Sequence, residues 1–235
     1  MVKYIFLFMW SAVYAQSYPV GSKYMNEQIV FHKYITLQYN EKDEQARWVY
    51  YKLHSGMLSD KVKRKEVSFT IDPLVKTGSA DNSDYRKNKY DKGHLCPAND
   101  MQFSKEAMRE CFYLSNAAPQ LHSVNAGDWR QIELFVHKLA NYDTLYVVTG
   151  TLVNKGAKKI GKNEVSIPNF FWKSVYSVKR KSCISFLVPN IATQMNINEY
   201  VVTTDLLEDM TGLDLWSDVG TAVMESNKNT GVFED

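Results

Sequence analysis

The order of strand and helix signals along this chain restricts its fold more than any other feature of the sequence. Runs of β-branched and aromatic residues, typical of strands, recur at residues 48–53, 145–149, 165–167, 171–178 and 183–188. The clearest helical period lies in residues 128–140, where Trp129, Ile132, Val136 and Leu139 form an apolar stripe. Because strands and helices are mixed without a regular alternation, we predict an α+β fold.

Weaker signals complete the expected order of elements. Ser104 would cap a short helix over residues 104–111, and Gly212 would end a late helix over residues 198–210. The other expected segments are strand character at residues 28–39, a strand at 67–71, a polar loop at 76–90 and an extended stretch at 113–115. A chain of 235 residues is long enough for one domain with a full hydrophobic core.

The N-terminal residues have the layout of a secretory signal peptide. Lys3 precedes an apolar run at residues 4–10, and small residues lead to Ala15 before Gln16. The run is shorter than the ~20 residues of a membrane-spanning helix, which argues against an anchor. We therefore expect cleavage after residue 15 and a secreted or periplasmic protein with no membrane span. An N-terminal arm over residues 16–44 and a main domain over residues 45–235 would follow.

The charge balance excludes a protein that binds polyanions through its overall charge. The chain has 28 Lys and Arg against 26 Asp and Glu, a net charge of +2, and losing Lys3 with the signal peptide would leave +1. Binding to nucleic acid would therefore need local basic patches. Basic runs occur at residues 61–65, 155–162 and 179–181, although such runs are more often solvated turns or strand ends.

The three cysteines, Cys96, Cys111 and Cys183, have several interpretations. An exported chain could oxidise two of them to a disulfide. A zinc site made by His94, Cys96 and Cys111 lacks a recognised ligand spacing. We favour the third interpretation, in which all three are small buried hydrophobic side chains.

His94 is the first candidate for chemistry, because it follows Gly93 in the motif Asp91-Lys92-Gly93-His94. An imidazole near its reference pKa of ~6.5 can accept a proton at neutral pH. Glycine has no Cβ, so Gly93 would allow a tight turn or a close approach to a ligand. The combination suggests a general base beside a bulky substrate, although a lone histidine is more often a surface or core residue.

Asn125, Glu133 and His137 lie at the start and along one side of the predicted helix. Asn125 is a favoured N-cap residue, and Asp128 three positions later could complete a capping box. The Asn125 amide oxygen is also a hard ligand that suits Mg²⁺. Glu133 and His137 are four residues apart and share a helix face, where Glu133 could hold a metal-bound water. An ordinary exposed pair would have the same spacing.

Taken in order, these motifs resemble the DNA/RNA non-specific endonuclease family, whose hallmark is Asp-Arg-Gly-His. The resemblance covers roughly residues 45–215. It is carried by residues 91–98, by Tyr113-Leu114-Ser115-Asn116 with Pro119-Gln120, and by Asn125-x-Gly127-x-Trp129-x-x-x-Glu133, with residues 146–150 and 167–173 similar to the family's later core. It implies the ββα-metal finger nuclease fold, in which helices flank a central, mostly antiparallel sheet.

The resemblance also implies roles for individual residues. His94 would be the general base, Asn125 the direct ligand of a catalytic Mg²⁺, and Glu133 a residue that reaches the metal through water. Asn116 would support the site, and Arg64 is the best match for an arginine that stabilises charge on the phosphate. The substrates would be DNA and RNA, cut to 5′-phosphate products. Mn²⁺ could replace Mg²⁺, and the chain could form a homodimer.

The chain departs from the family pattern at three positions. Lys92 and His137 stand where the family usually has arginine, so both would contact substrate phosphate more weakly, and Cys96 occupies a position more often taken by alanine. Two alternatives stay open, and the departures at Lys92 and His137 support only the second. One is a phosphodiesterase or pyrophosphatase on small nucleotides, which a small closed pocket would favour. The other is a nucleic-acid-binding protein that has lost catalysis.

Overall fold

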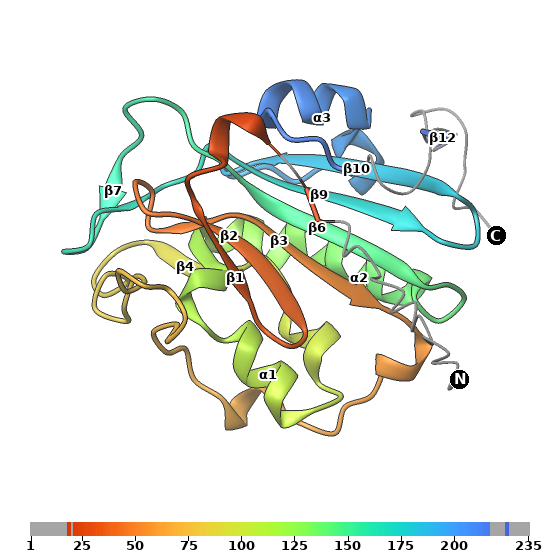
Figure 1. The fold of residues 1–235 in the computed structure, drawn as a ribbon, viewed down its shortest axis with the longest axis horizontal. Coiled ribbons are helices and arrows are strands. Elements are labelled where there is room, and N and C mark those ends of the chain that lie inside the picture. The colour runs from red at the N-terminus through yellow and green to blue at the C-terminus, as the bar shows by residue number, and fades with distance from the viewer. Residues whose placement is uncertain (1–17, 20, 217–223, 226–235) are drawn as a thin grey trace, which may run out of the picture.

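A central sheet of eight strands forms the middle layer of the molecule, which the computed structural model describes for residues 18–19, 21–216 and 224–225 (Figure 1). Seven strands follow the spatial order β1-β2-β3-β6-β9-β10-β11, and β12 pairs with β10. All described pairs in this sheet are antiparallel except β10 with β12. The strands are β1 (Gln28–Phe31), β2 (Ile35–Asn40), β3 (Gln45–Leu53), β6 (Leu145–Leu152), β9 (Phe170–Ser177), β10 (Ser182–Pro189), β11 (Val201–Val202) and β12 (Met224–Glu225). The predicted α+β class with a mostly antiparallel sheet is therefore confirmed.

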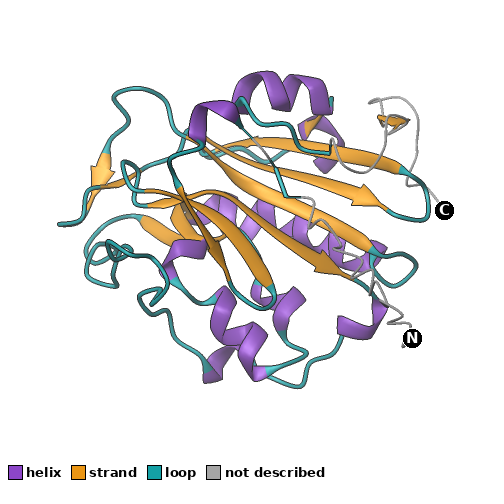
Figure 2. Ribbon diagram, in the orientation of Figure 1, coloured by secondary structure: helices purple, strands orange, loops and turns teal. Residues whose placement is uncertain are grey.

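Helices cover both faces of this sheet (Figure 2). α1 (Lys105–Cys111) and α2 (Trp129–Leu139) pack on one face, and α3 (Thr204–Thr211) packs on the other. Successive side chains of a strand point to opposite faces, so β9 contributes Phe171 to the first hydrophobic layer and Trp172 to the second. Lys173, two residues after Phe171, therefore faces the layer that contains α1 and α2.

A separate hairpin brings the motif Asp91-Lys92-Gly93-His94 next to α2. β4 (Tyr90–His94) pairs with β5 (Ala117–Leu121) in antiparallel register, with His94 opposite Ala117. The chain then passes through a π-helical turn, Val124–Asp128, directly into α2. Two strands and a helix thus form one ββα unit. A second short hairpin, β7 (Lys159–Ile160) with β8 (Val165–Ser166), lies outside the main sheet.

Gly93 is needed for packing inside this hairpin. A Cβ at Gly93 would lie 2.3 Å from Oε1 and 2.6 Å from Cβ of Gln120, so the Gln120 side chain occupies the space that any other residue would fill. Gly93 lies within a regular strand and is not among the glycines with positive φ. The expected tight turn or close approach to a ligand is therefore wrong, because the neighbouring strand covers this glycine.

Several predicted elements are confirmed. Ser104 caps α1 by accepting a hydrogen bond from the Ala107 backbone nitrogen at 3.0 Å. The apolar stripe of α2 is buried, and the central strand expected at residues 145–149 is β6. Gly212 ends α3 with a left-handed φ of 69°. The strands expected at residues 165–167, 171–178 and 183–188 correspond to β8, β9 and β10.

Residues 28–39 belong to the main sheet and do not form an irregular arm. β1 pairs with β2, and β2 pairs with β3. Val30, Ile35 and Leu37 are buried in the same core cluster as the side chains of α1 and α2. The strand character expected there is confirmed, whereas the boundary placed at residue 45 does not separate an arm from the sheet. The expected signal peptide, residues 1–15, lies outside the described residues.

Three other local predictions are wrong. Residues 67–71 form one isolated bridge, Thr70 with Tyr113, in place of a strand, and Leu114–Asn116 is a 3₁₀ turn in place of an extended stretch. Backbone hydrogen bonds join the two segments. The Thr70 amide donates to the Phe112 carbonyl, and the Leu114 amide donates to the Thr70 carbonyl. The late helix begins at Thr204, since the Thr203 hydroxyl caps it by accepting from the Leu206 amide at 3.2 Å.

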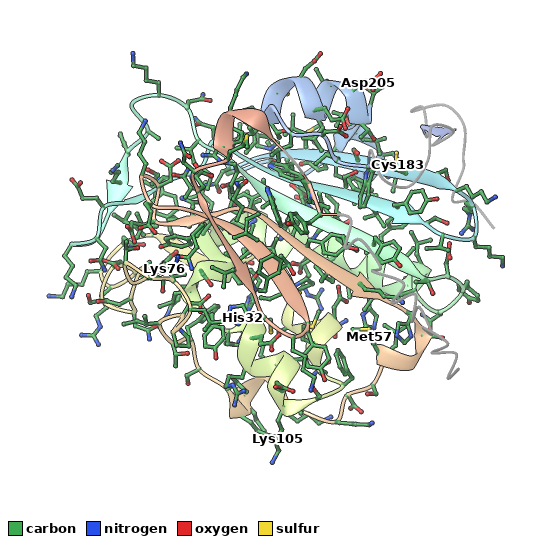
Figure 3. All side chains as sticks on the ribbon, viewed as in Figure 1. His32, Met57, Lys76, Lys105, Cys183 and Asp205 are labelled. Atoms are coloured by element: carbon green, nitrogen blue, oxygen red, sulfur yellow. The ribbon has the colours of Figure 1, made fainter. Side chains whose placement is uncertain are left out.

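The three cysteines are buried and unpaired with one another, as we favoured. Cys183 lies on β10 beside α3 (Figure 3), where its sulfur is 3.1 Å from the Thr204 hydroxyl. Burial raises the pKa values of the Cys96 and Cys111 thiols, so both stay protonated at neutral pH. Among the described residues, no helix has the length and hydrophobicity of a membrane span.

Candidate active site

His94 ends β4 with its ring buried against two phenylalanines. The ring centre lies 4.7 Å from that of Phe69 and 4.9 Å from that of Phe112, and the residue is 8% exposed. Its Nε2 atom is buried and has no hydrogen-bond partner among the described residues. Buried polar atoms are normally satisfied by protein or ordered water, so this nitrogen is free to bond a water or a ligand.

The surroundings of His94 keep its imidazole neutral. Burial, assisted by the positive charge of Arg64, lowers the pKa of His94 from 6.5 to about 3. Burial disfavours the charged imidazolium because the site has less water to solvate it. At neutral pH the ring can therefore accept a proton, as a general base must.

A pocket of about 280 Å³ brings together four of the residues predicted from the sequence. Its wall includes His94, Asn125, Glu133 and Arg64, which come from β4, the π-helical turn, α2 and the 3₁₀ turn Arg64–Glu66. The other lining residues are Pro97, Ala98, Asn99, Ala126, Arg130 and Leu134. Residues up to 70 positions apart in sequence, Arg64 and Leu134, thus share one cavity beside His94.

The Asn125 side chain is held by Asp91, the first residue of the motif. Asn125 Nδ2 donates a hydrogen bond to Asp91 Oδ2 at 2.8 Å. Since the nitrogen is bound to a carboxylate, the amide oxygen is left as the acceptor that the pocket can use. The same Asp91 oxygen lies 2.8 Å from Nδ1 of the exposed His122. Asp91 therefore orients a side chain that is suited to bind a cation.

The alternative interpretation of Asn125 as a helix cap is wrong. Asn125 lies inside the π-helical turn, and no side chain caps the start of that turn or of α2. Asp128, the expected partner in a capping box, accepts hydrogen bonds from the Tyr200 hydroxyl at 2.7 Å and the Thr193 hydroxyl at 3.2 Å. The backbone is non-helical at Gly127, with φ −104° and ψ −109°, and the Asn125 side chain bonds to Asp91 in place of a backbone amide at the start of α2.

Asn116 lies behind the pocket and does not line it. The residue is fully buried, and its side chain bonds both backbone groups of Cys96, with Oδ1 accepting from the amide and Nδ2 donating to the carbonyl, each at 2.9 Å. Nδ2 also donates to the Cys111 carbonyl at 2.7 Å. Asn116 therefore positions the segment that follows His94, and it has no contact that would make it a catalytic residue.

Two further donors bond to the backbone carbonyl groups of His94 and Leu95. Trp129 Nε1 donates to the His94 carbonyl at 3.3 Å, and Lys173 Nζ donates to the Leu95 carbonyl at 3.3 Å. Lys173 is fully buried, and its ammonium group lies 4.9 Å from a ring centre of Trp129. The peptide groups from His94 to Cys96 thus each have a partner from α2, β9 or Asn116.

Glu133 in the pocket wall lies near two buried charged side chains, Asp100 and Lys173. Burial raises the pKa of Glu133, with Asp100 adding to the effect and Lys173 opposing it. Burial lowers the pKa of Lys173, whereas Glu133 and Asp100 raise it. Tyr51 donates to Asp100 Oδ2 at 3.1 Å. Lys173 is therefore the cation that faces the carboxyl groups of this layer.

His137 does not join the pocket, although it shares a helix with Glu133. Its Nδ1 lies 2.8 Å from Asp100 Oδ1, and it is not a pocket-lining residue. The buried Asp100 carboxylate therefore holds the imidazole outside the pocket wall, and the phosphate contact of His137 stays a prediction.

Lys92 lines a second, open groove that adjoins the pocket. This cationic groove, of about 590 Å³, is formed by Arg64, Val67, Ser68, Phe69, Asn82, Tyr85, Arg86, Lys92 and Phe112. Lys92 Nζ donates to Asn82 Oδ1 at 2.6 Å and lies 5.2 Å from the ring centre of Phe69. Arg64 lines both the groove and the pocket, so the two lie side by side.

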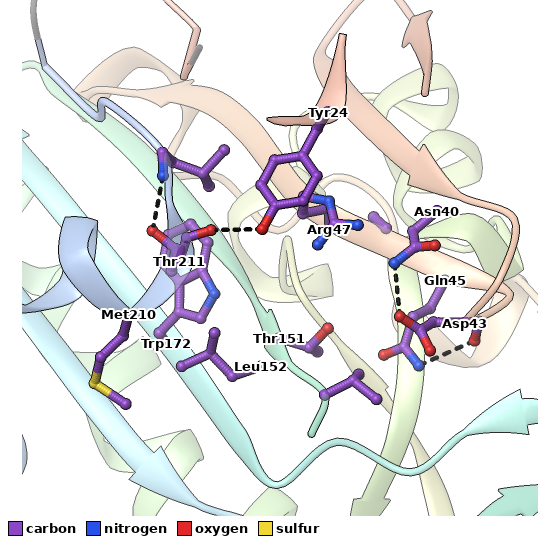
Figure 4. A pocket seen from close by; sticks show the side chains of 13 residues that line it. Tyr24, Asn40, Asp43, Gln45, Arg47, Thr151, Leu152, Trp172, Met210 and Thr211 are labelled. Atoms are coloured by element: carbon purple, nitrogen blue, oxygen red, sulfur yellow. Dashed lines mark hydrogen bonds between the residues drawn. The ribbon is translucent and has the colours of Figure 1, made fainter. Parts of the chain in front are cut away.

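A third pocket, of about 130 Å³, contains none of the predicted site residues (Figure 4). It is lined by Trp172, which packs in the hydrophobic layer on the α3 side of the sheet, and by Tyr24, whose hydroxyl donates to the Thr211 carbonyl at 3.0 Å. Because His94 faces the other layer, this pocket has no direct access to the proposed chemistry.

The described residues offer an amide site for a cation in place of a cluster of anionic ligands. Among them, no group of three or more His, Cys, Asp and Glu side chains is arranged to hold a metal ion, which also argues against the zinc alternative. The Asn125 amide oxygen, held in place by Asp91, and the Glu133 carboxyl group remain as oxygen donors in the pocket. Few protein oxygens with several waters suit Mg²⁺.

Three residues of the site were missed by sequence reasoning. The sequence motif indicates no separate role for Asp91, yet in the structure Asp91 orients Asn125. Arg130 lines the pocket, and its place three residues before Glu133 on a helix could have indicated this. Lys173 also carried a signal, because a lysine amid the apolar residues of a central strand is expensive to bury without a partner.

Comparisons with known proteins identify relatives at the levels of sequence and structure. The sequence model of the family described as DNA/RNA non-specific endonuclease matches residues 14–222. Nuclease EXOG, mitochondrial, of Danio rerio is 35% identical over 196 residues, which cover 75% of this chain and 57% of that protein. Endonuclease G, mitochondrial, of Homo sapiens is 31% identical over 194 residues, which cover 75% of this chain and 65% of that protein.

The fold is similar to that of a solved nuclease. A chain in the crystal structure of the EndoG/EndoGI complex matches with a TM-score of 0.78 and 26% identity, over 85% of this chain and 90% of that chain. The expected nuclease fold is therefore confirmed. The chain spans only a little over half the length of the EXOG protein it matches, 57%.

The names of these relatives contradict the expected secreted or periplasmic location. EXOG and Endonuclease G are both named as mitochondrial, as is Nuclease 1 of Schizosaccharomyces pombe, which is 32% identical over 157 residues, 58% of this chain and 49% of that protein. The expectation of export rested on one short apolar run with a single cation, Lys3, before it. A pattern that brief does not outweigh relatives that match three quarters of the chain, and the prediction of export is wrong.

Proposed function

Because this chain belongs to the DNA/RNA non-specific endonuclease family, we propose that it is a metal-dependent endonuclease that hydrolyses phosphodiester bonds in DNA and RNA. One observation carries the proposal. His94, whose buried Nε2 has no hydrogen-bond partner among the described residues, lines a pocket that also contains Asn125, Glu133 and Arg64. A base, an oriented oxygen ligand and a cation for the phosphate are the groups that phosphodiester hydrolysis needs.

His94 acts as the general base in this proposal. Its neutral imidazole takes a proton from a water bonded at Nε2, and the bonds to the His94 and Leu95 carbonyls limit its movement during that transfer. A base with so low a pKa is weak in the free enzyme. An anionic phosphate beside Arg64 offsets the charge that helps to lower the pKa of His94, so the base becomes stronger when substrate is bound.

The pocket fits a divalent cation, Mg²⁺ in this proposal, with Mn²⁺ as a substitute. Asn125 would hold the ion directly through Oδ1, because Asp91 occupies the amide nitrogen, and Glu133 would reach it through water. When bound, the cation supplies positive charge that stabilises the charge developing on the phosphate and on the leaving oxygen. Burial raises the pKa of Glu133, so a nearby cation would favour its ionised form.

Two guanidinium groups in the pocket wall are placed to bind the reacting phosphate. Arg64 and Arg130 approach from different elements, the 3₁₀ turn before Phe69 and the first turn of α2. Arginine presents a planar fork of donors that matches phosphate oxygens, and such contacts carry no base information. We therefore propose cleavage with little sequence preference and 5′-phosphate products.

The shape of the site favours a polymer over a small nucleotide. A phosphodiesterase or pyrophosphatase for small substrates would be expected to have a closed pocket, whereas here the pocket lies beside the open cationic groove, with Arg64 in the wall of both. The alternative of an inactive nucleic-acid-binding protein has less support, because the base and the oriented amide are both present in the pocket.

Incubation of the protein with supercoiled plasmid and with single-stranded RNA, in Mg²⁺ or in EDTA, tests the proposal. We expect Mg²⁺-dependent cleavage of both, and ends that a 5′-phosphate-dependent ligase can join. The His94→Gln variant should bind both nucleic acids with little cleavage. Binding by the wild-type protein without cleavage between pH 5 and 9 in Mg²⁺ or Mn²⁺ would establish the inactive alternative. Hydrolysis of mononucleotide esters or pyrophosphates alone would establish the small-substrate alternative.

A further inference from the structure

We propose that the cationic groove is a subsite for a second phosphate of the substrate strand, one nucleotide away from the phosphodiester that is cleaved, with Arg86 and Lys92 as its charged ligands. This inference rests on the proposed function. It adds a binding site and a minimum substrate, namely a strand segment that carries two phosphates. Arg86 and Tyr85 acquire a role that the pocket around His94 does not give them.

The position of the groove fits the next phosphate along a strand. Phe69 separates the two sites, with its ring centre 4.7 Å from that of His94 and 5.2 Å from Lys92 Nζ. Lys92 Nζ therefore lies within 10 Å of the His94 ring centre. Arg64 lines both cavities, so a strand that passes from one to the other remains beside a cation.

The charges in the groove lack a counter-ion. Three cations, Arg64, Arg86 and Lys92, line it, and no carboxylate does. Among the described residues, none of these three forms an ion pair, whereas Lys33, Arg47 and Lys162 elsewhere on the surface do. Burial and the charge of Arg86 lower the pKa of Lys92, which indicates two like charges close together. A phosphate dianion or diester would relieve this repulsion.

A hydroxyl group in the groove wall also lacks a partner. The Tyr85 side chain is 8% exposed, and its hydroxyl is buried without a hydrogen-bond partner among the described residues. Buried hydroxyls are rarely left unsatisfied, and a phosphate oxygen accepts hydrogen bonds readily. Lys92 Nζ lies 5.9 Å from the Tyr85 ring centre, so both groups border the same space.

The aromatic rings of the groove are not arranged to stack on a nucleobase. Phe69 contacts the His94 and Phe112 rings, and its other neighbour is the Lys92 ammonium group. Phe112 lies 5.5 Å from the Arg64 guanidinium carbon. Lys92 thus lies over the Phe69 ring and Arg64 over the Phe112 ring, so a ligand in the groove contacts these cations before the rings. The chemistry selects the phosphate backbone, which carries no sequence information.

Cleavage of short thymidine substrates tests the subsite. TpT has one phosphodiester, whereas pTpT and TpTp carry a second phosphate on its 5′ or 3′ side. We expect wild-type kcat/KM in Mg²⁺ to rise at least tenfold over TpT for one of the two extended substrates. Arg86→Gln should reduce this ratio to less than threefold, and Tyr85→Phe should reduce it by a smaller factor. On single-stranded DNA, Arg86→Gln should also lower the slope of log KM against log salt by about 0.7.

Lys89→Gln is the matched control, because Lys89 is an exposed lysine of the same loop that does not line the groove. It should keep the wild-type ratio between the extended substrate and TpT. The subsite is refuted if neither extra phosphate increases kcat/KM, or if Arg86→Gln retains the full increase while plasmid cleavage remains normal. Failure of the proposed function is a separate result, since the wild-type protein would then cleave neither plasmid nor any thymidine substrate. Thermal melting of all three variants, Arg86→Gln, Tyr85→Phe and Lys89→Gln, verifies their folding.

Discussion

Asn125 Nδ2 and Asp91 Oδ2 are joined by a hydrogen bond of 2.8 Å, although the two residues lie on different elements, the π-helical turn and β4. This contact decides which end of the Asn125 amide is available to a cation. It also explains why an aspartate begins the motif that ends at His94. A carboxylate that orients a metal ligand typically affects metal affinity by 10- to 100-fold when it is removed.

Asp91→Asn should therefore weaken metal binding. The new amide can donate as well as accept, so it no longer holds Asn125 Nδ2 in one orientation. We expect the Mg²⁺ concentration for half-maximal cleavage to rise at least tenfold. His122→Gln is the control, because it changes the other, exposed partner of Asp91 and should leave that concentration within twofold of wild type. Equal Mg²⁺ dependence in wild type and Asp91→Asn would remove Asp91 from this role.

His94→Ala should abolish cleavage by several orders of magnitude, since it removes the proposed base. The imidazole also packs between Phe69 and Phe112, so its removal leaves a cavity and should lower the melting temperature. His94→Gln fills more of that space and provides the second variant. Single-turnover cleavage rates and thermal melts of both variants separate lost chemistry from lost packing. A cleavage rate within tenfold of wild type in either variant would rule out His94 as the base.

The pH dependence of kcat/KM should have its acidic limb well below pH 6.5. Cleavage needs neutral His94, and burial with the Arg64 charge lowers the pKa of His94 to about 3, so activity is lost only as pH falls toward that value. Arg64→Gln removes the nearby cation, which should raise the pKa of His94 and move the acidic limb to higher pH. Profiles of kcat/KM from pH 3.5 to 8, recorded for wild type and Arg64→Gln, compare the acidic limbs of the two proteins. An acidic limb that does not move would show that Arg64 has no electrostatic effect on the base.

The lowered pKa of His94 also predicts that the stability of the fold changes with pH. The unfolded chain binds a proton at His94 near pH 6.5, whereas the folded chain does not until about pH 3. Stability is therefore fully present above pH 6.5 and falls on acidification, by up to about 1.4 kcal/mol per pH unit in this window. Urea unfolding of wild type and His94→Gln between pH 7 and 4 should show a smaller decrease in the variant. If the unfolding free energy of the two proteins fell equally with pH, His94 would not be the group whose protonation destabilises the fold.

Lys173→Met should reduce activity and stability together. It leaves Glu133 and Asp100 without a nearby buried cation and the Leu95 carbonyl without its donor, and an unsatisfied buried acceptor alone costs about 1–3 kcal/mol. We expect kcat to fall at least tenfold at a temperature where the variant is folded, with KM nearly unchanged, because the base is displaced and the phosphate ligands are not. Lys52→Met, on an exposed position of β3, is the control.

The double variant Lys173→Met with Glu133→Gln separates two effects of losing Lys173. One is the loss of a positive charge near Glu133, and the other is the displacement of the His94 segment. The double variant should regain part of the lost unfolding free energy in urea, since one uncompensated carboxylate is gone. It should not regain kcat. Recovery of kcat along with stability would mean that Lys173 acts through the fold alone.

Local sequence patterns predicted the parts of this protein whose structure depends on near neighbours. The stripe of Trp129, Ile132, Val136 and Leu139 required a helix with one buried face, and it forms α2. Ser104 and Gly212 mark helix ends because capping involves groups within a few residues. The motif residues His94, Asn125 and Glu133 were identified as a set, and they meet in one pocket.

Tertiary structure decided what each of these residues touches. Asn125 fits a helix cap as well as a metal ligand by sequence, and only the approach of Asp91 from β4 distinguishes the two. Lys173 is 78 residues from the carbonyl it holds, and His137 is diverted to Asp100 by a contact across 37 residues. Such contacts depend on which strands pair and which charges are buried together, and the energy of a buried charge is set by all its neighbours at once. The sequence by itself thus determined the groups available for chemistry, and the packing of the ββα unit against β9 determined which of them reach the reaction.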